Sequence, residues 1–434
     1  MTSTPEDTAF EVVEICAGAG GQALGLEKAR FTHRLAVELD PNAYETLRTN
    51  LPGKILINGQ ERDIARNGDV ADPGIFNPVD HKKVALFAGG VPCPPFTIAG
   101  KQLGASDERD LFAWAVEQVG ALEPQAVLLE NVRGLSLPRF AGYRQHVLDR
   151  LTDFGYAAEW RLLNASDYGV PQLRPRFVLI AMKSEHMANF SWPEPSVQAV
   201  TVSEAIADLM GENGWPQVDE WAKLADKIAP TIVGGSKKHG GADLGPTRAK
   251  RAWRELSVDA MGLANEAPGP DDWFDLQKGD GPKLTNEMVA RIQGWLPGYE
   301  WTFTGRKTSR YRQIGNAFPP PVAEALGRAI KRALKNRNRD QEERPSTPHD
   351  PVYRVLREYD DFIATEDLIE KAGLTLGIAD LERRIALLKR DFEVYSEPRG
   401  DGVLSYRLGK FKAFVGQEDH ERHIKFAQNR SKIS

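Results

Sequence analysis

Short apolar runs alternate with longer amphipathic stretches from residue 12 to about residue 180. The short runs have the length and composition of buried strands, and the longer stretches have the period of helices that cover a sheet. This alternation predicts an α/β fold with a Rossmann-like, doubly wound parallel sheet. The predicted strands are residues 12–15, 35–37, 84–88, 126–129 and 177–181, and the predicted helices are residues 22–29, 43–50, 111–122 and 143–153.

The regular pattern is lost between residues 183 and 283, where glycine and proline become frequent. This stretch predicts a separate, smaller and loop-rich domain. Helical signals return at 285–295 and 321–334, and the polar, charged residues 336–350 predict a linker. The irregular stretch also contains five tryptophans, Trp192, Trp215, Trp221, Trp253 and Trp273.

The last part of the chain predicts a compact addition. Residues 351–409 contain three helical segments and then two strand-like segments joined by a turn that contains proline and glycine. Three helices followed by a hairpin resemble a winged helix, whereas a small helical module for protein contacts is the alternative that the pattern leaves open. Residues 410–434 form a basic tail.

Composition narrows the class of protein. A chain of 434 residues with 41% hydrophobic content can bury a large core, and its two cysteines are too few for a disulfide framework or a thiolate zinc site. We therefore expect no metal and a reducing compartment. The polar amino terminus and the absence of a long apolar run predict a cytoplasmic protein without a membrane partner.

Positive charge is clustered although the net charge is −5. That net charge excludes a uniformly basic coat, but nucleic-acid binding needs only a local basic surface. Solvated surface charge is the alternative interpretation. The clusters are Lys237, Lys238 and His239, then Arg248, Lys250, Arg251 and Arg254, and then Arg306, Lys307, Arg310 and Arg312.

One cysteine, Cys93, lies on a proline-braced turn that follows the predicted strand at residues 84–88. Free cysteines are most often small buried hydrophobic residues. The prolines that flank Cys93 favour an exposed, stiff turn instead, at the carboxyl edge of the sheet. Cys93 is therefore a candidate nucleophile, provided that the fold supplies a positive or polar neighbour for its thiolate.

A glycine-rich turn follows the first predicted strand and opens a helix, which is a typical place for an anionic or nucleoside ligand. Ala23 stands where dinucleotide-binding proteins have their third glycine, so the sequence disfavours a pyrophosphate. Glu38, at the end of the second strand, is placed to accept hydrogen bonds from ribose hydroxyls. The alternative is a tight turn beside a surface acid.

Four short motifs occur in order: Pro92-Cys93, Glu130-Asn131-Val132, Gln172-x-Arg174-x-Arg176 and Gln313-Ile314-Gly315-Asn316. Together they resemble the DNA (cytosine-5) methyltransferases, which transfer a methyl group from S-adenosylmethionine. The resemblance covers residues 12 to about 334 and is specific because the whole set is ordered.

The resemblance implies a role for each polar residue. The Cys93 thiolate would attack carbon 6 of cytosine, and Glu130 would hydrogen-bond or protonate ring nitrogen 3. Arg176 would donate to oxygen 2 and help to hold Glu130, while Arg174 would steady the site or a phosphate. Asn131 would anchor its loop. The sequence identifies no residue that removes the proton from carbon 5, and ordinary surface arginines are the alternative interpretation of Arg174 and Arg176.

The resemblance also implies the pocket of the methyl donor. Two departures from the family pattern predict weaker adenine stacking: Cys16 replaces a usual phenylalanine, and Leu39 replaces a frequent tryptophan. Asp63 competes with Asp69 as the residue near adenine. The implied pocket consists of Ala17, Gly18, Gly20, Gly21, Glu38, Asp69, Val70, Pro92, Leu111 and Asn316.

The implied organisation is a catalytic and cofactor-binding domain at 8–182, a target-recognition domain at 183–283 and a return segment at 284–335 that completes the first domain. The basic, tryptophan-bearing loops of the target-recognition domain would read double-stranded DNA, and the target cytosine would be flipped into the Cys93 pocket. We expect a monomeric bacterial restriction-modification enzyme with a cognate endonuclease as its partner. A transfer-RNA cytosine-5 methyltransferase, a catalytically silent DNA-binding protein and, remotely, a nicotinamide oxidoreductase are the alternatives.

Overall fold

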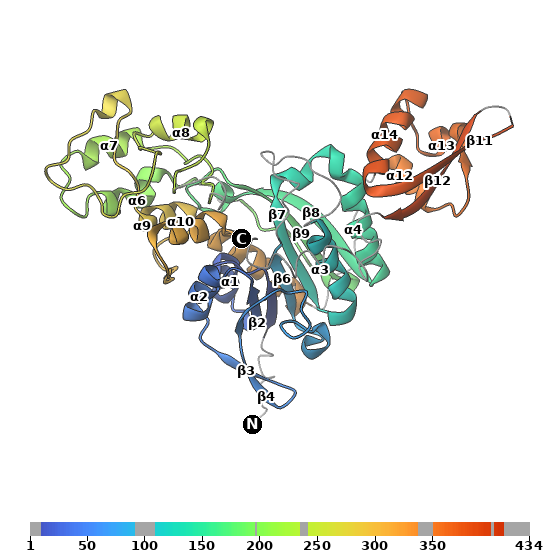
Figure 1. The fold of residues 1–434 in the computed structure, drawn as a ribbon, viewed down its shortest axis with the longest axis horizontal. Coiled ribbons are helices and arrows are strands. Elements are labelled where there is room, and N and C mark those ends of the chain that lie inside the picture. Colours follow the sequence, from blue (N-terminus) through green and yellow to red (C-terminus); the bar gives the residue numbers. More distant parts are fainter. Residues whose placement is uncertain are drawn as a thin grey trace.

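The computed structural model describes residues 10–91, 109–195, 198–234, 242–336, 350–400 and 403–411. A seven-stranded sheet lies at the centre of the molecule, with strand order β5-β2-β1-β6-β7-β9-β8 (Figure 1). Strands β5, β2, β1, β6 and β7 are parallel, whereas β9 runs antiparallel to both β7 and β8. The strands are β1 (Glu11–Ile15), β2 (Thr32–Glu38), β5 (Ala65–Asn67), β6 (Leu86–Gly90), β7 (Ala126–Val132), β8 (Tyr156–Asn164) and β9 (Pro175–Lys183).

The five predicted strands are all present, but the prediction of a parallel sheet is wrong at one edge. The predicted helix at residues 143–153 is present as α4, but it leads into the long strand β8, which was not predicted. The chain then returns from β8 to its antiparallel neighbour β9 without an α-helix, because antiparallel neighbours need only a short connection. A separate hairpin, β3 (Lys54–Ile57) and β4 (Gln60–Asp63), projects beyond the sheet.

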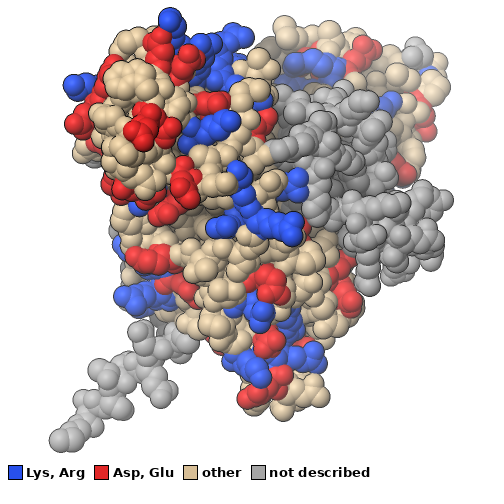
Figure 2. All heavy atoms as spheres, turned by 60° about the vertical axis from the view of Figure 1, so that its left-hand side comes forward, with Lys and Arg blue, Asp and Glu red and all other residues tan. Residues whose placement is uncertain are grey.

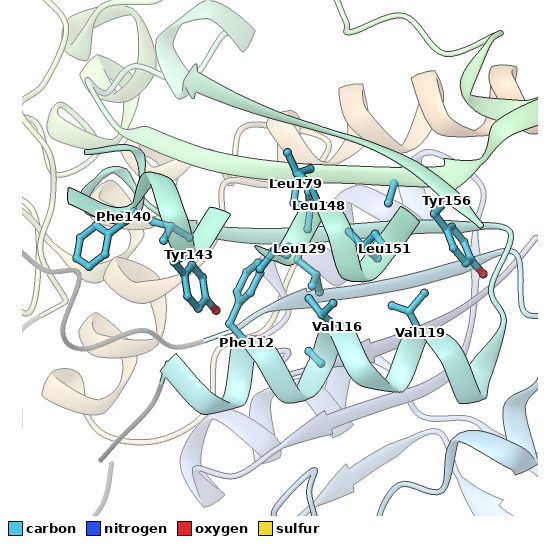
Figure 3. Packing of buried hydrophobic residues seen from close by; sticks show 14 of the residues in the cluster. Phe112, Val116, Val119, Leu129, Phe140, Tyr143, Leu148, Leu151, Tyr156 and Leu179 are labelled. Carbon is cyan, nitrogen blue, oxygen red and sulfur yellow. The ribbon is translucent and has the colours of Figure 1, made fainter. Parts of the chain in front are cut away.

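Helices cover both faces of the sheet. On one face lie α3 (Arg109–Leu122) and α4 (Ala141–Asp153), whose apolar sides meet the sheet around Leu129 and Leu179 (Figure 3). On the other face lie α1 (Gly21–Lys28) and α11 (Pro320–Lys335). These two helices approach so closely that a Cβ on Gly25 would lie 2.3 Å from the carbonyl oxygen of Pro320. The late helix α11 therefore completes the first domain.

A second core lies beside the sheet and contains α6 (Val202–Met210), α7 (Val218–Leu224) and α8 (Thr247–Arg254). The helices α9 (Asn286–Gln293) and α10 (Lys307–Asn316) belong to this core as well (Figure 1). The apolar residues of α9 and α10 lie in this second core, whereas Gln313 on α10 accepts a hydrogen bond from Thr46 Oγ1 of the first domain at 2.6 Å. The chain packs against the sheet itself again at α11.

The carboxy-terminal part lies at the end of the molecule opposite to α6, α7 and α8 (Figure 1). It contains α12 (Pro351–Arg357), α13 (Thr365–Lys371) and α14 (Ile378–Asp391), and a small antiparallel sheet in the order β10-β12-β11. Tyr353 Oη donates to Asp149 on α4 at 2.6 Å, and Arg357 pairs with the same carboxylate. The strands are β10 (Ile363–Ala364), β11 (Phe392–Pro398) and β12 (Leu404–Phe411).

Several predicted features lie outside the described residues. These are Pro92 and Cys93, the basic residues Lys237, Lys238 and His239, the central part of the linker at 337–349, and the tail from residue 412 onward. Within the described ranges, no helix is both long and apolar enough to cross a bilayer. The same ranges contain no group of three or more His, Cys, Asp or Glu side chains arranged to hold a metal ion.

Candidate active site

Glu130 and Arg176 face each other at the carboxyl edge of the parallel strands. Glu130 lies near the end of β7 in register with Gly90 of β6, and Arg176 lies at the start of the antiparallel strand β9. Arg176 Nε is 3.4 Å from Glu130 Oε2. Because β9 is antiparallel, its first residues reach the edge where β6 and β7 end. The fold thus joins two motifs that are 46 positions apart.

Both members of this pair are largely buried. Burial raises the pKa of the Glu130 carboxyl above its usual value, and the positive charges of Arg176 and Arg174 oppose that rise. Glu130 Oε2 is buried and has no hydrogen-bond partner among the described residues. A buried carboxyl group with a raised pKa and a free oxygen can donate a proton or a hydrogen bond to a ligand.

Asn131 secures the same edge. Its side-chain amide donates to the carbonyl of Val91 at 3.3 Å, and its Oδ1 accepts from the backbone of Val132 at 2.8 Å. Val91 is the last described residue before the turn that contains Cys93. Asn131 therefore fixes the end of β7 against the point where β6 leaves the sheet.

Of the two roles expected for Arg174, to steady the site or to contact a phosphate, its surroundings favour the first. Its side chain is buried and donates from Nη1 to the carbonyl of Ile232 at 2.8 Å, and from Nη2 to the carbonyls of Gly315 and Ala317 at 2.7 and 3.1 Å. Burial lowers the pKa of Arg174. The guanidinium, enclosed by three carbonyls, joins the start of β9 to the end of α10 and to Ile232 in the second core, which we call the recognition core. It does not face solvent, where a phosphate would lie.

Two glutamines that sequence analysis left without a role complete this clamp. Gln172 Nε2 donates to Gln293 Oε1 at 2.7 Å, and Gln172 Oε1 accepts from the backbone of Ile232 at 2.8 Å. Gln293 Nε2 donates in turn to the carbonyl of Ala317 at 2.8 Å. Both glutamines are fully buried. In the sequence, these glutamines could be noticed because each is a polar residue at a position where the pattern of the element favours an apolar one.

The glycine turn after β1 forms a cradle at the neighbouring part of the same edge. The backbone N–H of Gly18 donates to Glu38 Oε2 at 2.7 Å, and Asp40 N donates to Glu38 Oε1 at 2.7 Å. A Cβ added to Gly18 would meet no atom within 4 Å, so this side of the turn is open. Each Glu38 oxygen keeps a further lone pair, which suits the two hydroxyls of a ribose.

Other residues expected in or near the donor pocket follow β5 and begin α3. Asp69 and Val70 follow β5, which pairs with the end of β2, whereas Asp63 is exposed on the β3–β4 hairpin. This placement favours Asp69 over Asp63 as the residue near adenine. Burial, and then the negative charges of Glu38 and Asp69, raise the pKa of Cys16. Leu111 packs beside the sheet core at the start of α3.

Asn316 ends α10 and lies against the recognition core. A Cβ on Gly234 would be 2.2 Å from Asn316 Oδ1, so the two segments touch here. Gly20 and Gly21, also expected in the donor pocket, face packing partners. A Cβ on Gly20 would lie 2.3 Å from Cζ2 of Trp301, and one on Gly21 would lie 2.4 Å from the carbonyl oxygen of Phe318.

Three tryptophans of the recognition region supply its core. Trp215, Trp221 and Trp253 are almost completely buried in the second core. Trp192 stacks edge-on against Phe190 and donates to Glu159 Oε2 at 2.8 Å. Large aromatic side chains in an irregular region supply a core where regular elements are short. Trp273 is 75% exposed.

Basic side chains gather on one side of the molecule near the recognition core. Figure 2 shows Lys and Arg side chains on the face between the recognition core and the lower part of the molecule. Arg248 and Arg251 lie one turn apart and exposed on α8, and Arg306 and Arg310 are exposed at the start of α10. In the carboxy-terminal part, by contrast, Arg383 pairs with Asp380 at 2.7 Å.

The fold and the site together define a class of enzyme. A glycine turn bonded to Glu38 lies beside a buried carboxyl–guanidinium pair, at one edge of a mixed seven-stranded sheet. This arrangement is typical of α/β enzymes that bind a nucleoside-containing ligand at the carboxyl ends of their strands.

The chain belongs to the C-5 cytosine-specific DNA methylase family, whose model matches residues 10–332. It is 61% identical over 425 residues to the type II methyltransferase M.NaeI of Lentzea aerocolonigenes, covering 98% of this chain and 99% of that protein. It is 46% identical over 334 residues to the type II methyltransferase M.NgoMIV of Neisseria gonorrhoeae, covering 76% of this chain and 99% of that protein. The carboxy-terminal part lies outside the family match.

A solved structure agrees with the fold. A candidate DNA modification methyltransferase encoded in a prophage of E. coli aligns with 76% of this chain and all of that chain, at 22% identity and a TM-score of 0.50. Membership of the family makes the chain a DNA (cytosine-5-)-methyltransferase with DNA as its substrate, and the family implies S-adenosylmethionine as the methyl donor.

Proposed function

We propose that the enzyme methylates carbon 5 of a cytosine flipped out of a specific double-stranded DNA sequence, through a covalent bond between Cys93 and carbon 6. The observation that carries this proposal is the buried Glu130–Arg176 pair at 3.4 Å. Cys93 follows the end of β6 by three residues, and β6 is paired with β7 at Glu130. The chain therefore leaves the sheet toward Cys93 beside the carboxyl group that would hold the ring.

The reaction requires electrons to reach carbon 5 of an unreactive ring. The Cys93 thiolate adds to carbon 6, and the electron pair of the ring double bond moves toward carbon 5 while Glu130 hydrogen-bonds or protonates nitrogen 3. Arg176 donates to oxygen 2 and stabilises the charge that develops there. After carbon 5 has accepted the methyl group, it loses its proton to a base, and the bond between carbon 6 and Cys93 breaks to restore the double bond.

The donor pocket is the glycine-turn cradle. S-adenosylmethionine supplies an electrophilic methyl group when it is bound. Glu38 would hold the ribose, Asp69 and Val70 would lie near adenine, and Gly18 would leave room for the ligand against the backbone. The open side of Gly18 and the spare lone pairs of Glu38 fit such a group. The other members of the pocket are Ala17, Gly20, Gly21, Pro92, Leu111 and Asn316.

The recognition core would supply the contacts to DNA. Arg248 and Arg251, exposed on one side of α8, are suited to phosphate oxygens, and Trp273 is the tryptophan that remains exposed. The enzyme acts in a type II restriction-modification system of the bacterial cytoplasm, as a monomer beside an endonuclease that cuts the same sequence. The three helices and small sheet of the carboxy-terminal part form a winged-helix-like module.

The test is methylation by the purified full-length Cys93→Ala variant. We expect no methyl transfer to DNA, with S-adenosylmethionine affinity by calorimetry within about twofold of wild type, because the thiol lies in the acceptor half of the site. Normal methylation by this variant would refute the mechanism. Bisulfite mapping of DNA methylated by wild type identifies the sequence and the target cytosine, and competition with transfer RNA excludes or supports an RNA substrate.

A further inference from the structure

The glycine turn of the donor pocket is held from behind by a distant part of the chain. Trp301 lies in the segment between α9 and α10 and is 282 positions from the turn, yet its Nε1 donates to the carbonyl of Ala19 at 2.7 Å. Its ring occupies the space where a Cβ of Gly20 would be, 2.3 Å from Cζ2. Gly20 has a φ of 91°, a conformation that favours glycine.

Two glycines of the turn therefore have different surroundings on its two sides. Gly18 faces open space and binds Glu38, whereas Gly20 faces Trp301. The turn itself closes with a hydrogen bond from Gly20 N to the carbonyl of Ala17 at 3.0 Å. A rotation of the Ala19 peptide would break the bond to Trp301 and also turn the neighbouring backbone that presents Gly18 to Glu38. The indole thus restricts the turn to one conformation.

Trp301 is itself fixed to the first domain. The next residue, Thr302, exchanges two hydrogen bonds with Asn50 at the end of α2 (Pro41–Asn50), both at 2.9 Å. Thr304 N donates to Thr46 Oγ1, also at 2.9 Å. The indole ring packs against the small apolar cluster that contains Leu47. These contacts fix the ring against the first domain.

We infer that Trp301 is a positioning residue for the methyl donor: it holds the Ala17–Gly21 turn in the conformation in which Gly18 and Glu38 accept the ribose part of the ligand. This inference rests on the proposed donor pocket. The residue does not touch the reacting atoms, so its loss weakens donor binding and leaves the acceptor half of the site intact.

The experiment compares full-length Trp301→Phe with Trp192→Phe. Each variant loses one indole hydrogen bond, and Trp192 is bonded to β8 at the opposite edge of the sheet. We expect Trp301→Phe to raise the KM for S-adenosylmethionine roughly three- to tenfold, the effect of one lost hydrogen bond, with kcat and DNA affinity within about twofold of wild type. Trp192→Phe leaves all three constants within about twofold of wild type.

A Glu38→Gln variant tests the donor pocket itself, independently of the role of Trp301. If Glu38→Gln weakens donor binding and Trp301→Phe does not, the inference is wrong and the pocket stands. If neither variant changes donor binding, the proposed pocket is wrong as well. An equal loss of donor and DNA affinity in Trp301→Phe would show a general folding defect and overturn the specific role.

Hydrogen exchange on the unmodified protein gives a second test that needs no variant. Addition of S-adenosylmethionine should slow exchange in the peptide that contains residues 17–21 and in the peptide that contains residues 301–304, because the two are bonded through Trp301. Protection of the turn without any change at 301–304 would contradict the inference.

Discussion

Replacing Arg174 with methionine should destabilise the junction between the sheet and the recognition core. The change removes a buried donor and leaves the carbonyls of Ile232 and Gly315 without this partner, while the carbonyl of Ala317 keeps its bond from Gln293 Nε2. Each orphaned, buried carbonyl costs about 1 to 3 kcal/mol. Removing the buried charge offsets part of that cost, so we take the lower bound for two carbonyls and expect a loss of about 2 kcal/mol.

The assay is urea unfolding followed by tryptophan fluorescence. Trp215, Trp221 and Trp253 lie in the recognition core, so the emission reports the part of the molecule that Arg174 holds. Arg383→Met serves as the control, because Arg383 is an exposed arginine paired with Asp380 on α14. We expect that control to change stability by less than about 0.5 kcal/mol.

A loss below about 1 kcal/mol in Arg174→Met would refute the reasoning, because two orphaned carbonyls in a closed interior should cost more than that. Activity gives a second readout. The clamp joins Ile232 to the segment that ends at Asn316, so a loosened junction should raise the KM for DNA more than it lowers kcat. A fall in kcat with an unchanged KM for DNA would assign Arg174 to the chemical step instead.

Two further predictions concern Glu130 and the second core. Glu130→Gln should lower kcat by a factor of roughly 10² to 10⁴ with little change in donor affinity, since the amide cannot transfer a proton to the ring. In wild type, burial raises the pKa of Glu130, so kcat should fall as pH rises through that value; a pH profile that Glu130→Gln leaves unchanged would contradict this role. Trp221→Ala should cost about 3 to 5 kcal/mol of stability by leaving a cavity, as measured by urea unfolding. Weaker DNA binding by fluorescence anisotropy with unchanged stability would show instead that Trp221 contacts DNA.

Apolar runs of strand length allowed β1, β2, β6, β7 and β9 to be predicted, whereas the short parallel edge strand β5, with the sequence Ala-Arg-Asn, has no such run. The strand β8 escaped prediction because Glu159 and Arg161 interrupt its apolar residues, and only Tyr156 and Leu163 in it are buried. The site residues Glu130 and Arg176 were predicted from motif order, and their facing positions follow from the antiparallel direction of β9, which the pattern did not reveal. Hydrogen bonds between buried side chains and distant parts of the chain produce no periodic pattern in the sequence. For that reason the clamp around Arg174 and the contact of Trp301 with Ala19 required the structure.

The carboxy-terminal part of the chain packs against α4 of the first domain. Asp149 is 9% exposed and receives Tyr353 and Arg357 from α12, while His146 meets the ring of Phe392 edge-on at 5.6 Å. Residues 350–411 carry thirteen acidic and ten basic side chains, a balance that suits this protein surface better than a DNA backbone. An enzyme cut at the linker would expose this face of α4 and leave Asp149 without Tyr353 and Arg357, so truncation to the family core would require new partners for that carboxylate.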